Sequence, residues 1–146
     1  MSARVTRLSP EGLHQNPAYS QAVVVEGNVR TIYVGGQNGV SADGRVVGVG
    51  DLAAQTEQVF DNLRTLLAGA GATLHDVVKW TVFVVQGQDI RPGFEVFQKA
   101  WGNAPPPIVT FASVAGLVHP DFLVEIEAVA ITDASESSGT EGTHGR

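Results

Sequence analysis

Residues 77–85, with the sequence VVKWTVFVV, constrain the fold of this chain more than any other segment. The run is rich in β-branched and aromatic residues, which favour a strand. Side chains of a strand alternate between its two faces, and here large apolar groups occur on both. A strand of this kind is expected to lose water on both faces. Both faces of the sheet that contains this strand must therefore be covered by other structure.

Six segments of the sequence have strand character and two have helical character. The Gly27-Asn28 pair is typical of a tight hairpin turn between the second and third strands. Asp51 is a suitable N-cap for a first helix, in which apolar residues recur at helical spacing. The predicted strands are Arg4–Leu8, Gln21–Glu26, Thr31–Gly35, Val77–Val85, Ile108–Val114 and Val124–Ile131, and the predicted helices are Leu52–Ala70 and Ile90–Trp101.

This order of elements predicts an α+β protein in which a mixed six-stranded sheet carries two helices on one face. We expect a single domain over residues 1–132, followed by a disordered tail over residues 133–146 that contains mainly Ser, Gly, Thr and Glu. Two helices can cover only one face of the sheet, and the sequence offers no third helix. The simplest cover for the other face is a further copy of the chain, so we predict a homo-oligomer.

Composition and charge argue against several classes of function. The net charge of −6 and the scattered Lys and Arg residues are unfavourable for nucleic-acid binding. There is no Cys, and the His residues show no metal-ligand spacing, so we predict neither a metal nor a cofactor. The sequence has no apolar run of membrane-spanning length and no recognisable signal peptide. We therefore expect a cytoplasmic protein that acts on a small molecule and not on a membrane.

The most informative polar feature is the pair of carboxylates in the last strand, VEIEAVAI. Alternation places Glu125 and Glu127 on one face and Val124 and Ile126 on the other. One interpretation of Glu125 is a general base or a water-binding carboxylate. The alternative is a solvated or ion-paired residue of a strand. For Glu127 the structural interpretation is preferred.

Five motifs, in the right order, resemble the Rid family, whose members are also known as RidA, YjgF and L-PSP endoribonuclease-like proteins. The resemblance spans about residues 5–132 and consists of NPAYSQAVVV from Asn16, YVGGQ at Tyr33–Gln37, QTEQVFDNLRTLL at Gln55–Leu67, DVVKWTVF at Asp76–Phe83, and the segment from Pro107 that ends in VEIEAVA. It implies a homotrimer with a chorismate-mutase-like fold of the bacillus type and with ligand sites in clefts between subunits. It also implies hydrolysis of reactive enamines and imines, such as 2-aminoacrylate, to a 2-keto acid and ammonia.

The resemblance assigns a role to several residues of the predicted cleft. Tyr19 matches a ligand-contacting tyrosine, Gly35 and Gly36 match a segment whose backbone lines the pocket, and Glu125 matches the water-handling glutamate. A packing role for Tyr19 is an equal alternative.

Two positions of the predicted cleft depart from the family pattern. Val109 stands where family members have an arginine that grips the substrate carboxylate, and Phe111 stands where a small residue is usual. A carboxylate that enters an apolar cleft without a cation loses hydration that nothing offsets.

Two explanations of the missing arginine remain open. Arg30, Arg45 or Arg91 replaces it in space, or the ligand is neutral or cationic.

The sequence thus leaves three functional hypotheses. The first is a Rid-type enamine or imine deaminase with an atypical pocket, in which Glu125 is catalytic and Tyr19, Gly35, Gly36, Val109 and Phe111 bind substrate. The second is a homotrimer that binds a small molecule without catalysis. The third, which the acidic charge disfavours, is an endoribonuclease or translation inhibitor.

Overall fold

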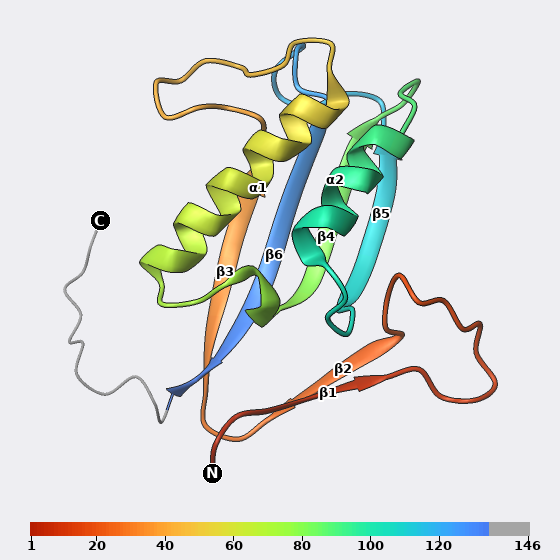
Figure 1. Ribbon diagram of the computed structural model, residues 1–146, viewed down its shortest axis with the longest axis vertical. Helices are drawn as coiled ribbons and strands as arrows, with labels where there is room; N and C mark the ends of the chain where they lie inside the picture. The colour runs from red at the N-terminus through yellow and green to blue at the C-terminus, as the bar shows by residue number, and fades with distance from the viewer. Residues whose placement is uncertain (135–146) are drawn as a thin grey trace.

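The computed structural model describes residues 1–134 of the 146-residue chain (Figure 1). Its elements are β1 (Arg4–Leu8), β2 (Ala22–Glu26), β3 (Val29–Gln37), α1 (Leu52–Gly69), the 3-10 turn η1 (Leu74–Asp76), β4 (Val77–Val85), α2 (Arg91–Trp101), β5 (Ile108–Val114) and β6 (Val124–Asp133). All six predicted strands and both predicted helices are confirmed. Strand β6 includes Asp133, the first residue of the predicted tail, whereas residues 135–146 of that tail lie outside the described part of the chain.

The six strands form two sheets instead of the single predicted sheet. Strands β3, β6, β4 and β5 lie side by side in that order, with β4 and β5 parallel and the other pairs antiparallel. Strands β1 and β2 form a separate antiparallel ribbon. The predicted α+β class, with two helices on one face of a mixed sheet, is confirmed (Figure 1).

The predicted hairpin between the second and third strands is wrong, because β2 pairs with β1 while β3 pairs with β6. Gly27 does turn the chain, with a φ of 94°. However, the backbone of the N-terminus fills the turn: Asn28 N donates to Met1 O at 2.9 Å, and a Cβ on Gly27 would lie 2.2 Å from Ser2 O. The chain therefore leaves the turn toward the other sheet.

The β1–β2 ribbon crosses the lower end of the four-stranded sheet in Figure 1 and is tied to it on two sides. Ala3 N donates to Asp133 Oδ2 on β6 at 3.1 Å. At the other end of the ribbon, Ser20 donates from its backbone N to Pro107 O at 3.0 Å and from its hydroxyl to Pro106 O at 2.6 Å. Both bonds hold the ribbon at the start of β5.

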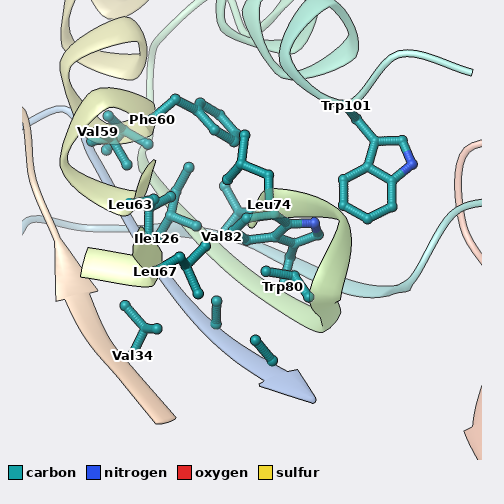
Figure 2. Close-up of a cluster of buried hydrophobic side chains, with 14 of the residues drawn as sticks. Val34, Val59, Phe60, Leu63, Leu67, Leu74, Trp80, Val82, Trp101 and Ile126 are labelled. Carbon is teal, nitrogen blue, oxygen red and sulfur yellow. The ribbon is translucent and has the colours of Figure 1, made fainter. Parts of the chain in front are cut away.

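Helix α1 supplies most of the apolar core. Asp51 accepts a hydrogen bond from Ala54 N at 3.1 Å and so caps the helix as predicted. Apolar residues of α1 then pack on the inward side chains of β4 and β6 (Figure 2). The largest of these inward side chains is Trp80, which is 0% exposed and meets Phe60, Phe97 and Trp101 edge to face at ring-centroid distances of 5.7, 5.7 and 6.3 Å.

Both helices cover the same face of the four-stranded sheet (Figure 1). We call the other side the open face; it carries Tyr33 from β3, Thr81 and Phe83 from β4, and Glu125, Glu127 and Val129 from β6. Tyr33 is 80% exposed, and Phe83 and Val129 are only half-buried. The two-sided apolar character of residues 77–85 thus leaves apolar side chains uncovered within one chain.

A buried glutamine on α1 fixes the start of β6, the strand that carries both carboxylates. Gln55 is 0% exposed, and its Nε2 donates to Asp121 O at 2.8 Å and to Gly48 O at 3.1 Å. Its Oε1 accepts from Leu123 N at 2.9 Å. One side chain therefore satisfies three backbone groups of two loops.

Replacing Gln55 by Leu is expected to lower the free energy of unfolding by about 2–5 kcal/mol, because the buried backbone partners lose their hydrogen bonds. Gln58 on the same helix is half-buried and, within residues 1–134, its side chain bonds only Asn62, at 2.9 Å. Gln58→Leu is therefore a matched control expected to cost under about 1 kcal/mol. Urea denaturation of the two variants measures the difference. Equal losses of unfolding free energy in the two variants would mean that the hydrogen bonds of Gln55 do not stabilise the fold.

Candidate functional site

Glu125 lies on the open face of β6, where it is half-buried and directly opposite Phe83 of β4. One of its carboxylate oxygens is held by the loop that follows β3. Asn38 Nδ2 donates to Glu125 Oε1 at 3.2 Å and to the backbone oxygen of Val124 at 3.0 Å. The carboxylate thus sits on a rigid central strand and has a defined neighbour on one side.

The other oxygen of Glu125 lies over the backbone of Gly36. Between the pairs Val34–Ala128 and Gln37–Ile126 the register shifts, so that Gly35 and Gly36 form a β-bulge in β3. A Cβ on Gly36 would lie 2.3 Å from Glu125 Oε2, whereas a Cβ on Gly35 would meet nothing within 4 Å. Gly36 is therefore required for close approach of the carboxylate, and Glu125 Oε2 accepts no hydrogen bond within residues 1–134.

None of the three arginines considered as substitutes for the missing cation contacts Glu125. Arg30 caps the end of α1 by donating to Ala70 O at 2.9 Å. Arg45 pairs with Asp43 at 2.9 Å, and Arg91 pairs with Asp89 at 2.8 Å.

The Arg91 pair is tight: hydrogen bonds from the guanidinium and the backbone of Arg91 lower the pKa of Asp89 to about 2. Over the part of the chain that the structure describes, neither Glu125 nor Glu127 forms an ion pair.

Tyr19, Val109 and Phe111 come together, but on the helix face of the sheet and away from Glu125. Val109 is the register partner of Trp80, and Phe111 is the partner of Val82, so both point to the side of the core. Within one chain these residues and Glu125 thus lie on opposite sides of the sheet, and the predicted cleft between subunits stays a prediction. The reason is the alternation of strand side chains: Glu125 is opposite Phe83, which points the other way.

These three residues line a cavity of about 370 Å³ between the N-terminal halves of the helices, strand β5 and the loop before β2. Among the described residues no ionised side chain belongs to its lining, and Phe94 and Phe111, 47% and 49% exposed, lie at the surface. The polar groups of the lining come from Asn16, Tyr19 and Thr56, and the Thr56 hydroxyl is already bound to Leu52 O at 2.7 Å. This cavity suits an apolar group.

The described residues contain no group of three or more His, Asp or Glu side chains placed to hold a metal ion. No helix among residues 1–134 has both the length and the apolar character needed to cross a membrane.

Comparison with known proteins gives the family. The family model described as Endoribonuclease L-PSP matches residues 11–132. The chain belongs to this family, which is the Rid/YjgF family. A RutC family protein of Pyrococcus abyssi is 37% identical over 77% of this chain and 84% of its own length. A rat protein named 2-iminobutanoate/2-iminopropanoate deaminase is 32% identical over 84% of this chain and 85% of its own length.

Solved structures of Rid proteins share the fold. A member of the Rid family from Yersinia pestis superposes with a TM-score of 0.76 at 36% identity, covering 89% of this chain and 98% of its own. RidA from the Antarctic bacterium Psychrobacter sp. gives a TM-score of 0.63 at 32% identity, covering 85% of this chain and 92% of its own.

Asn38 is the site residue that sequence reasoning missed. It lies in the Gly-rich loop of residues 38–50, whose length and composition indicate only a connection. Its contact with Glu125 joins residues 87 positions apart. The only local signal was the pair of glycines before it, which is typical of close backbone approach.

Gly36→Ala is expected to push the Glu125 side chain away from β3 while lowering the free energy of unfolding by no more than about 1 kcal/mol, because a mobile side chain gives way and not the backbone. Gly35→Ala is the matched control, since the added methyl group meets open space. Crystal structures and thermal melts of both variants test this. An unmoved Glu125 in Gly36→Ala would contradict the assigned geometry.

Proposed function

We propose that this chain is a Rid-type hydrolase of imines or enamines, in which Glu125 binds and activates the attacking water. The observation that supports this most directly is the half-buried carboxylate of Glu125, bound by Asn38 through Oε1 and without a partner among residues 1–134 at Oε2. A carboxylate with one anchored and one available oxygen suits general-base catalysis. Its position on a central strand limits its motion.

The proposed reaction needs only water and proton transfer. An enamine first tautomerises to the imine, and water then adds to the carbon of the C=N bond while Glu125 accepts a proton. That proton returns to nitrogen and gives a carbinolamine. Its hydroxyl proton then passes to nitrogen through Glu125 as the C–N bond breaks, so that ammonia leaves and a carbonyl product remains. No cofactor or metal enters this scheme.

The charge around Glu125 favours a neutral or cationic imine. A substrate carboxylate beside Glu125 would be repelled, and Arg30, Arg45 and Arg91 are all engaged elsewhere. A protonated imine would instead be attracted to the carboxylate. The rat relative is named for two imines that carry a carboxylate. We propose that this chain differs in that preference, because Val109 occupies the position of the arginine in the family pattern.

We further propose that the active form is a homotrimer and that the open face lies at the interface between subunits. Tyr33, Phe83 and Val129 present apolar surface there that one chain leaves uncovered. A neighbouring copy would exclude bulk water from Glu125 and complete the cleft.

Binding of a small molecule without turnover is the second candidate. It is favoured by the cavity around Tyr19, Val109 and Phe111, which is apolar and lies on the other side of the sheet from Glu125. An endoribonuclease is the least favoured candidate, because five arginines are already engaged within the chain. Four of them pair with carboxylates, and Arg30 binds the C-terminal end of α1.

The test is ammonia release from freshly generated 2-aminoacrylate and from benzaldimine, an imine without a carboxylate. We expect faster turnover of benzaldimine, and we expect Glu125→Gln to lower kcat by about 10²–10⁴-fold. Glu127→Gln is the matched control, two residues further on the same face and without a hydrogen bond in the described structure, and should stay within about two-fold of the unmodified protein. Equal turnover in the two variants would remove Glu125 as the water-handling group, and no acceleration of the hydrolysis of either compound would favour the binding protein.

A further inference from the structure

We infer that Asn38 is a positioning residue for Glu125 and that Oε2 of Glu125 is the oxygen that handles water. This inference rests on the proposed function for its catalytic meaning, although its geometry does not. Asn38 touches the carboxylate and would not touch the reacting atoms, so its effect on turnover passes through Glu125.

The side-chain amide of Asn38 binds a backbone oxygen and a side-chain oxygen of two consecutive residues in β6. Its Nδ2 carries two hydrogens, one directed to Val124 O at 3.0 Å and one to Glu125 Oε1 at 3.2 Å. Because Val124 directly precedes Glu125, the amide fixes the carboxylate relative to the strand that carries it. A hydrogen bond to a carboxylate is stronger than one between neutral groups.

The orientation of the Asn38 amide follows from its partners. Both partners are oxygens that only accept hydrogen bonds when Glu125 is ionised. A flipped amide would place Oδ1 against two acceptors, which is repulsive. Donation by Nδ2 is therefore the stable arrangement, and it engages Oε1 and leaves Oε2 as an acceptor.

Asn38 is itself held by helix α1 through two further amides. Asn62 Nδ2 donates to Asn38 O at 3.2 Å and to Val40 O at 3.0 Å. Gln58 Nε2 donates to Asn62 Oδ1 at 2.9 Å, which fixes the direction of the Asn62 amide. A chain of neutral amides thus runs from the helix to Glu125 and sets its geometry without adding charge to the site.

The bulge in β3 completes the assignment of the two oxygens. Oε2 occupies the space that a Cβ of Gly36 would fill, 2.3 Å from that point. Within the described residues no donor approaches this oxygen. Oε1 is therefore the anchored oxygen, and Oε2 is free to accept a proton from water.

The kinetic test compares Asn38→Ala, Glu125→Gln and the double variant. We expect Asn38→Ala to lower kcat by about 10- to 100-fold with KM within about two-fold, because the lost bond orients a catalytic group and not the substrate. In the Glu125→Gln background the same change should cost less than about two-fold, since coupled residues are not additive. A structural role would give the same loss in both backgrounds. Gln98→Ala removes an exposed amide on α2, outside this chain of amides, and should stay within about two-fold.

A second measurement does not depend on activity. The side-chain amide hydrogens of Asn38, followed by nuclear magnetic resonance, should exchange with water about tenfold faster in Glu125→Ala than in the unmodified protein. If exchange is unchanged, or if Asn38→Ala retains full kcat, the inference is wrong. If exchange responds as expected but the unmodified protein hydrolyses no imine, the positioning of the carboxylate is supported and the proposed function fails alone.

Discussion

The structure depends on a sheet that one chain can cover on only one side. Helices α1 and α2 pack on the same face, where Trp80 and its aromatic neighbours form the core. The opposite face keeps Tyr33 exposed and Phe83 half-buried. Apolar surface of this kind is costly in water. The same face carries Glu125, so the surface with uncovered apolar side chains also presents the candidate catalytic group. The proposed assembly and the proposed chemistry therefore involve the same face.

In the candidate site, a β-bulge and a loop determine the surroundings of the Glu125 carboxylate. The bulge at Gly35 and Gly36 removes side-chain atoms from one side of Glu125, and Asn38 supplies a donor on the other. Gln55 fixes the start of the same strand from the helix layer. These contacts come from three segments that are far apart in the sequence. These contacts anchor one carboxylate oxygen of Glu125 and leave the other available, and all of them are made by neutral groups.

The helices and strands could be predicted from the sequence more accurately than the orientation of their side chains and the pairing of the strands. The strand at residues 77–85 and the helix after Asp51 follow from local composition, spacing and capping, and they are correct. The partner of β2 could not be predicted, because Gly27 indicates a turn but not the N-terminal backbone that fills it. The family motif located Val109 and Phe111 but not their side of the sheet, since the register of β5 on β4 is a tertiary property. The contact of Asn38 with Glu125 joins residues 87 positions apart, and its one local signal was the glycine pair at Gly35 and Gly36.

The central claim is that the Glu125 carboxylate lies in a seam between copies of the chain without a cation beside it. A crystal structure of the assembled protein tests this most directly. We expect Tyr33 and Phe83 to be buried against a second copy, and no Arg or Lys nitrogen to lie within about 4 Å of Glu125. One rival is Arg7 on the β1–β2 ribbon, whose Nε is buried without a hydrogen-bond partner in the described residues. A monomer with Glu125 open to bulk water, or a neighbouring Arg7 paired with Glu125, would contradict the claim.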